Sequence, residues 1–187
     1  PVSGSGTLLV EVGKRVGIRG ANIFGQEANW NQYALTKMNL MLNGFKDSTF
    51  FWGDSLSNPK LTDDGGLKRF DIVASIPPFA DKWATEEAEF DRYGRFQYGI
   101  PPRSQATWAY ISHILASLKP NGRAVVVVPA GVLFRTSESK IRHQIIEHNL
   151  LEAVIELPQN LFYGAAISTA ILVFRKDRKL SLIHISE

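Results

Sequence analysis

Apolar positions along the chain alternate between helical spacing and short strand-like runs, which predicts an α/β domain with a mainly parallel sheet. Helical spacing predicts helices over residues 7–16, 29–42, 108–118 and 138–148. Short apolar runs predict strands over residues 21–25, 49–52, 70–75, 124–128, 151–157 and 169–174. No repeat and no linker divides the pattern, so we expect a single domain.

Several positions predict finer detail. The second helix carries one stripe at helical spacing, formed by Tyr33, Met38, Met41 and Leu42. The third predicted helix, over 108–118, has an apolar face formed by Trp108, Ile111, Ile114, Leu115 and Leu118. We expect Gly44 to end the second helix and Ser104 to cap the third. Residues 119–122, Lys-Pro-Asn-Gly, predict a turn, and the β-branched run 124–128 predicts a strand buried on both faces.

Composition narrows the possible chemistry only slightly. The chain contains no cysteine, which excludes a disulfide scaffold, a thiolate zinc site and a cysteine nucleophile. The four histidines share no ligand spacing with nearby acids, so we predict no metal site. No run approaches the roughly 20 apolar residues of a membrane helix, and we expect no membrane association. The net charge of +3 is compatible with a nucleic-acid partner but does not indicate one by itself.

The two ends and one internal segment stand apart from the pattern. The chain opens on Pro-Val-Ser-Gly-Ser-Gly, which is typical of a sequence entered within a domain. Residues 180–187 resemble a translated sequencing adaptor, so we expect a non-native tail there and a domain over residues 1–179. Residues 79–103 mix charges, aromatics and prolines without periodicity, and segments of this length are often functional or mobile.

Residues suited to a nucleoside cofactor follow the predicted strands at their carboxyl ends, where open α/β sheets bind ligands. Gly4-Ser5-Gly6 opens the first helix, where glycines allow close backbone approach and the helix end offers unpaired N–H groups. Glu27 lies 21 residues after Gly6, a spacing typical of an acid that binds ribose hydroxyls. Leu9 replaces the third glycine of the nicotinamide dinucleotide fingerprint, which disfavours a dehydrogenase. A plain strand-to-helix turn is the alternative interpretation.

Two further motifs could hold adenine rings. The Asp54 carboxylate could accept a hydrogen bond from an exocyclic amine, although Gly-Asp is also a common turn pair. In Ile76-Pro77-Pro78-Phe79, consecutive prolines predict a rigid loop that presents carbonyls beside an aromatic ring. Such a loop suits a base flipped out of a duplex, and a rigid loop around a buried Phe is the alternative.

A basic and aromatic cluster lies in the aperiodic segment. Arg92, Arg95 and Arg103 alternate with Tyr93, Phe96 and Tyr98. Basic residues between aromatics suit phosphate contact and base stacking, so this cluster is a hypothetical DNA contact next to the Pro-Pro loop. A solvated loop remains the alternative.

In this order the motifs resemble those of amino-group DNA methyltransferases, and are most similar to the modification subunits of type I restriction systems. The resemblance covers residues 1–179 and rests on segments 1–9, 24–29, 35–40, 53–56, 70–79, 118–123, 128–134 and 157–164. It implies a Rossmann-like S-adenosylmethionine-dependent methyltransferase fold with helices on both faces of a mostly parallel sheet. It also implies that the first strand and an N-terminal helical region are missing from this chain.

The resemblance also implies a function, the transfer of a methyl group from S-adenosylmethionine to the N6 of adenine in DNA. Its implied cofactor-binding residues are Gly4, Ser5, Gly6, Glu27 and Asp54, and its implied target-base residues are Ile76, Pro77, Pro78 and Phe79. The implied partners are double-stranded DNA, a specificity subunit and a restriction subunit. The implied location is the cytoplasm of a bacterium or archaeon.

Ile76 departs from the family pattern, which has Asn at this position. There the Asn side chain and the next proline carbonyl accept hydrogen bonds from the adenine amine, and Ile offers no acceptor. We expect a loss of about 10²–10³-fold or more in rate. A sequencing error at one codon is one explanation, and a catalytically silent subunit that binds cofactor and DNA is another. Glutamine methyltransferases also use an Asn-Pro-Pro-Tyr loop, but residues 157–162 argue against that activity.

Overall fold

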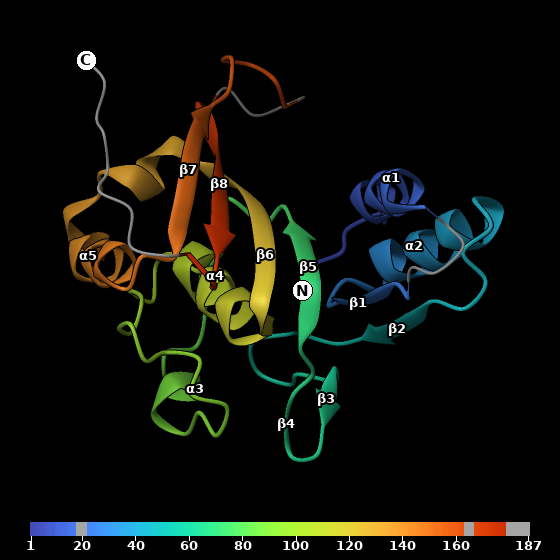
Figure 1. Cartoon of the computed structure of the whole chain (residues 1–187), viewed down its shortest axis with the longest axis horizontal. Helices are drawn as coiled ribbons and strands as arrows, with labels where there is room; N and C mark the ends of the chain where they lie inside the picture. The colour runs from blue at the N-terminus through green and yellow to red at the C-terminus, as the bar shows by residue number, and fades with distance from the viewer. Residues whose placement is uncertain (18–21, 163–166, 179–187) are drawn as a thin grey trace.

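The computed structural model describes residues 1–17, 22–162 and 167–178 (Figure 1). Its helices are α1 (Thr7–Val16), α2 (Trp30–Leu42), α3 (Glu86–Glu89), α4 (Thr107–Ala116) and α5 (Ser139–Glu147), with 3₁₀ turns η1 (Ala130–Leu133) and η2 (Thr136–Glu138). Its strands are β1 (Phe24–Glu27), β2 (Thr49–Trp52), β3 (Thr62–Asp63), β4 (Gly66–Leu67), β5 (Phe70–Ser75), β6 (Leu118–Pro129), β7 (Leu151–Glu156) and β8 (Thr169–Arg175). No helix in these ranges is long and apolar enough to cross a bilayer.

The main strands form two groups, a parallel pair and a mixed four-stranded sheet. Strand β1 pairs with β2 in parallel, and α1 and α2 lie beside them (Figure 1). The second sheet has the order β5-β6-β8-β7, in which β5 and β6 are parallel while β8 runs antiparallel to both of its neighbours. The α/β class is confirmed, as is the prevalence of one strand direction, since β5, β6 and β7 point the same way and β8 runs against them in a mixed sheet.

Helices α4 and α5 pack on one face of the four-stranded sheet and form the largest core with it. Alternate residues of β6, Ala124, Val126 and Val128, are completely buried in this core. Val125, on the opposite face, is 39 % exposed, and Ile72 and Ile155 are exposed there too. The prediction of burial on both faces is therefore wrong, because no helix of the described residues covers this second face of β6.

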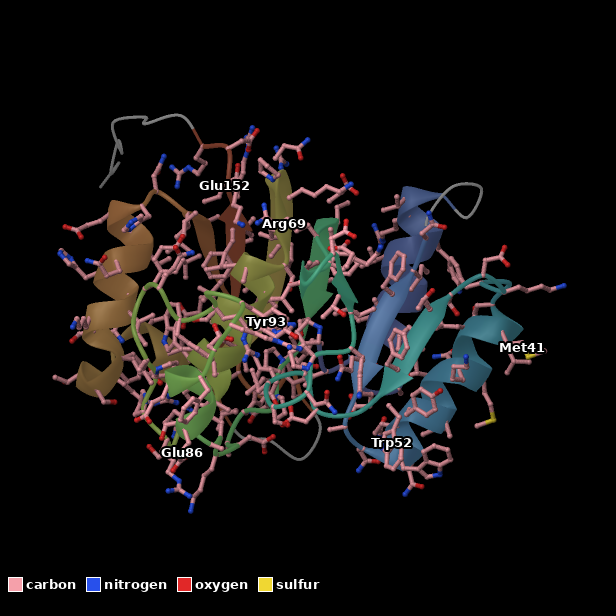
Figure 2. All side chains as sticks on the ribbon, turned by 90° about the horizontal axis from the view of Figure 1, so that it is seen from below. Met41, Trp52, Arg69, Glu86, Tyr93 and Glu152 are labelled. Carbon is pink, nitrogen blue, oxygen red and sulfur yellow. The ribbon has the colours of Figure 1, made fainter. Side chains whose placement is uncertain are left out.

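Helix α2 presents a different face to the core from the one predicted. Its buried residues are Thr36 and Leu40, with Tyr33 packed beside them. Met41 is 71 % exposed and points away from the body of the protein (Figure 2). The predicted stripe fails because this helix is apolar on two faces, and periodicity alone does not say which is buried. Gly44 ends the helix as predicted, with a φ of 85°.

Three predictions of local structure near other elements are also wrong. Strand β1 begins at Phe24 rather than at Ala21, which lies outside the described residues. Ala106, rather than Ser104, is the N-terminal cap of α4, and no side chain makes a capping hydrogen bond there. The N–H of Ala106 donates to Asp81 O at 2.9 Å. Residues 119–122 form a bulge inside β6, where the pairing shifts from Phe70–Leu118 to Ile72–Arg123, so the strand continues through the predicted turn.

A groove of about 720 Å³ separates the two sheets, between β1 and β5. Neither strand pairs across it, since β1 pairs only with β2 and β5 only with β6 among the described residues. The first residues of the chain close one end of the groove. Ser3 N–H donates to Gln26 O at 3.2 Å, and Ser75 Oγ donates to Pro1 O at 3.2 Å. The start of the chain thus connects the carboxyl ends of both strands.

Candidate cofactor and target-base site

The glycine loop before α1 is held by two side chains of α2. Thr36 Oγ1 donates to Gly4 O at 2.5 Å, and Asn39 Nδ2 donates to Ser5 O at 3.2 Å. Gly4 and Gly6 have φ values of +58° and +80°, which L side chains rarely adopt. A Cβ atom on Gly6 would lie 3.0 Å from Thr36 Cγ2, whereas one on Gly4 would have no neighbour within 4 Å. The loop is therefore packed at Gly6 and open at Gly4.

Glu27 joins this loop to the end of β1. Its side chain is largely buried, with the residue 8 % exposed. Oε2 accepts from Gly4 N–H at 2.8 Å, and Oε1 accepts from Asn29 N–H at 2.9 Å. Each carboxylate oxygen keeps a second lone pair for another donor. The glycine loop and the acid predicted from their spacing are thus in direct contact.

The loop after β2 fixes the Asp54 carboxylate. Oδ1 accepts from Leu56 N–H at 2.9 Å, and Oδ2 accepts from Ser57 Oγ at 3.0 Å. The turn that was the alternative interpretation of this residue is therefore present. Buried Gln26 also holds this loop, since its side-chain amide bonds Asn58 O and Lys60 N–H, both at 2.9 Å. This role of Gln26 could not be predicted, because nothing in the sequence distinguishes a buried glutamine from an exposed one.

Tyr110 of α4 lies where several carboxylates converge. The residue is 7 % exposed and packs with Leu56 in a small apolar cluster. Burial raises its pKa, and the negative charges of Asp54, Asp81 and Glu27 raise the pKa further. These charges act on one phenol only if the ends of β1, β2 and β5 approach the same side of α4. Tyr110 could not be singled out from the sequence, because it belongs to a helix that is buried almost throughout.

The Pro-Pro loop follows β5 and brings two aromatic rings together. Phe79 meets Phe162 edge to face, with ring centres 5.4 Å apart and planes at 86°. Phe162 comes from the segment after β7, which the sequence resemblance had included. Pro77 is buried, while Ile76 is 38 % exposed and adds no polar group to the loop. The site therefore has two adjacent aromatic rings in and near the Pro-Pro loop, and its residue 76 has no side-chain hydrogen-bond acceptor.

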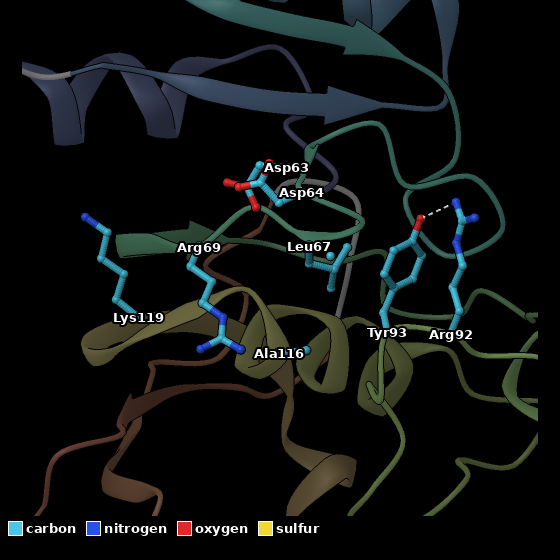
Figure 3. A pocket seen from close by; sticks show the side chains of 9 residues that line it. Asp63, Asp64, Leu67, Arg69, Arg92, Tyr93, Ala116 and Lys119 are labelled. Carbon is cyan, nitrogen blue, oxygen red and sulfur yellow. Dashed lines mark hydrogen bonds between the residues drawn. The ribbon is translucent and has the colours of Figure 1, made fainter.

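The three candidate DNA-binding arginines have separate environments. Arg95 is 3 % exposed and ion-paired with Asp91 at 2.7 Å, so the prediction of a phosphate contact is wrong for this residue. Arg92 Nη2 donates to the Tyr93 hydroxyl at 2.7 Å (Figure 3). Both residues line a pocket that includes Arg69, just before β5, and none of residues 76–79 of the Pro-Pro loop. The side chain of Arg103 is exposed, and its Nη1 atom lies 3.7 Å from Glu86 Oε1. Its contact with DNA stays a prediction.

Comparison with known proteins identifies the family. Residues 1–185 match the N-6 DNA Methylase family. The chain is 32 % identical to the type I restriction enzyme MpnII methylase subunit of Mycoplasma pneumoniae, over 94 % of this chain and 35 % of that protein. It is also 32 % identical to the MjaVIII methylase subunit of Methanocaldococcus jannaschii, over 95 % of this chain and 32 % of that protein.

Solved structures agree with this assignment. The methyltransferase subunit of a type I restriction-modification system from Streptococcus thermophilus superposes with a TM-score of 0.87 and 32 % identity, over 95 % of this chain and 39 % of that one. The predicted Rossmann-like methyltransferase fold is thereby confirmed. The chain spans about a third of the length of the curated relatives it matches. It belongs to the N-6 DNA methylase family.

Proposed function

We propose that the chain is the catalytic core of a DNA methyltransferase that transfers a methyl group from S-adenosylmethionine to the N6 of adenine within a restriction-modification system. The observation that carries this proposal is the direct contact between Glu27 and the glycine loop, on the same side of α4 as Asp54. Membership of the N-6 DNA methylase family supports the reaction. Because the relatives are about three times longer, the proposal concerns the whole protein of which this sequence matches one part.

The residues of the candidate site at Gly4, Glu27 and Asp54 fit S-adenosylmethionine by their chemistry. Glu27 offers acceptors for the two ribose hydroxyls, and Asp54 offers one for the adenine amine. The open side of Gly4 leaves room for a ligand to approach the backbone at the start of α1, where N–H groups are unpaired. When bound, this cofactor supplies a methyl group attached to a positively charged sulfur, which is an electrophile.

The chain itself would position the target base rather than react with it. Phe79 and Phe162 offer an aromatic wall for an adenine flipped out of the duplex. The Pro77 carbonyl would accept a hydrogen bond from the adenine amine and hold positive charge that develops on nitrogen. Catalysis of this kind consists of orientation and electrostatic stabilisation, and it requires no covalent intermediate with the protein.

Ile76 favours a second candidate, a silent subunit that binds cofactor and DNA without transfer. An apolar side chain at this point leaves the amine with one acceptor fewer in a site where charge develops. The proposed partners are the same for both candidates, namely double-stranded DNA, a specificity subunit and a restriction subunit. The relatives' names support this, since each is a methylase subunit of a type I restriction enzyme.

Transfer of labelled methyl groups by the assembled complex tests the proposal. The unchanged chain, Ile76→Asn and the apolar control Ile76→Val are each assembled with the specificity subunit and given DNA and S-adenosylmethionine. We expect Ile76→Asn to transfer about 10²–10³-fold faster than the other two, with the label in N6-methyladenine. Label on protein or on another base would contradict the function. Equal rates in Ile76→Asn and Ile76→Val would contradict the role given to position 76.

A further inference from the structure

Arg95 lies at the centre of a buried polar cluster that connects three distant parts of the chain. Its Nε atom donates to Asp91 Oδ1 at 2.7 Å, and its backbone N–H donates to Asp91 Oδ2 at 2.5 Å. Its Nη1 atom donates to Leu56 O at 2.8 Å and reaches Ser55 O at 3.4 Å. The same nitrogen lies 3.5 Å from His113 Nδ1 of α4. The aperiodic segment is thus anchored both to the Asp54 loop and to the core.

The cluster is neutralised and closed to solvent. The side chains of Arg95 and Asp91 are 3 % and 4 % exposed, so each charge has lost nearly all of its hydration. A buried ion pair persists when its remaining donors also find partners. The carbonyls of residues 55 and 56 are such partners for the guanidinium. Burial and the positive charge of Arg95 lower the pKa of His113 well below 6.5, which keeps that ring neutral beside the guanidinium.

A short path of hydrogen bonds leads from Arg95 to Asp54. The guanidinium holds the carbonyl of Leu56, and the N–H of the same residue donates to Asp54 Oδ1 at 2.9 Å. Gln26 holds the far end of this loop through Asn58 and Lys60. Between these two anchors the orientation of the Asp54 carboxylate depends on where Arg95 places the peptide groups of residues 55 and 56.

We propose that Arg95 is a positioning residue that orients Asp54 toward the adenine ring of the cofactor. This inference rests on the proposed cofactor, and it gives the Arg95 segment a role inside the protein in place of contact with DNA. Lysine at position 95 would keep the charge facing Asp91. It lacks the planar fork that bonds Asp91 and the Leu56 carbonyl together, so the loop would lose one of its two anchors.

Binding of two ligands to the same variants tests this role. The first ligand is S-adenosylmethionine, and the second is its analogue without the 6-amino group of the purine. We expect the unchanged chain to prefer the first by on the order of tenfold, because only that ligand can donate an amine hydrogen to Asp54. Arg95→Lys should lose most of this preference. Arg142→Lys is the matched control, since Arg142 also holds two carbonyls, Val132 O and Arg135 O, in a different loop.

The possible results distinguish a wrong cofactor from a wrong role for Arg95. If the unchanged chain binds neither ligand, the proposed cofactor is wrong, whatever Arg95 does. If Arg95→Lys weakens both ligands equally, or lowers only the melting temperature, Arg95 is structural and the positioning role is refuted. Asp91→Asn serves if Arg95→Lys does not fold, because it loosens the guanidinium while keeping the side chain's size. Asp54→Asn should abolish the preference by itself, and adding Arg95→Lys to it should change the preference no further.

Discussion

At the scale of single residues, two acids with largely buried side chains hold separate parts of the chain together, Glu27 at the glycine loop and Asp91 at Arg95. The spacing from Gly6 predicts that Glu27 binds ribose hydroxyls; that role stays a prediction, and the structure places the side chain against the glycine loop. Arg95 was predicted to contact DNA because basic and aromatic residues alternate in its segment, although Asp91 four residues earlier was a possible partner. Burial of an ion pair depends on elements distant in sequence, here α4 and the Asp54 loop. The residues next to Arg95 in the sequence therefore could not predict that the pair is buried.

The two glycines of the loop should respond differently to alanine. Both have positive φ, so each Gly→Ala substitution should cost about 1–2 kcal/mol in backbone strain. Gly6→Ala also brings a Cβ within 3.0 Å of Thr36, and we expect the greater loss of unfolding free energy there. Gly4→Ala meets no protein atom but fills the open side of the loop, so cofactor affinity should fall more than stability. Chemical denaturation and calorimetric titration of both variants measure these effects; the reverse pattern would contradict the packing described.

His113 should make the protein less stable in mild acid. Burial and the positive charge of Arg95 lower its pKa well below 6.5, so below that pH the unfolded chain takes up a proton that the folded chain does not bind. The free energy of unfolding should therefore decline as the pH falls from about 6.5, by up to about 1.4 kcal/mol per pH unit. His113→Gln, which does not titrate, should show a shallower decline between pH 7.5 and 5.5 in urea denaturation. If the free energy of unfolding declines equally steeply with pH in His113→Gln and in the unchanged chain, His113 is protonated in the folded state as it is in the unfolded state.

At the scale of elements, the positions of helices and strands could be predicted from the sequence, whereas the face that each of them buries could not. The limits of α1, β2 and β5 agree with the pattern of apolar residues. The face that α2 buries could not be predicted, because apolar residues occupy both of its sides. The same holds for β6, whose valines looked suited to burial on both faces, while Val125 is 39 % exposed.

The two faces of α2 give a direct comparison. Leu40 is fully buried, whereas Leu42 is 86 % exposed. We expect Leu40→Ala to lower the free energy of unfolding by about 2–5 kcal/mol, because it removes buried methyl groups and leaves a cavity. Leu42→Ala should change it by no more than about 0.5 kcal/mol. Equal losses in thermal or chemical denaturation would show that the predicted stripe, rather than the observed one, faces the core.

At the scale of the whole molecule, the groove between β1 and β5 and the open face of the four-stranded sheet are the main unfilled surfaces. Among the described residues, the facing edges of β1 and β5 pair with no further strand, so they suit an additional parallel strand, and Pro1 and Ser3 lie at the end where such a strand would finish. We propose that a strand preceding Pro1 occupies this groove, in accord with the sequence-based expectation of a missing first strand.

Lengthening the chain tests the proposed strand. Adding the residues encoded upstream of Pro1 should raise the melting temperature by several degrees, because a central strand would pair both edges and bury the groove lining. A glycine-serine extension of equal length is the control and should have no such effect. Equal melting temperatures for the two extensions would refute the proposal.

Calorimetric titration of S-adenosylmethionine into the chain and into Glu27→Gln tests the central claim most directly. The substitution keeps the size of the side chain but replaces one acceptor oxygen with an amide donor. The account predicts saturable binding by the unchanged chain and binding weaker by about tenfold or more for Glu27→Gln, with circular dichroism showing that both are folded. Absence of binding by the unchanged, folded chain, or equal affinity in the two proteins, would contradict the assignment of Glu27 and the glycine loop to the cofactor.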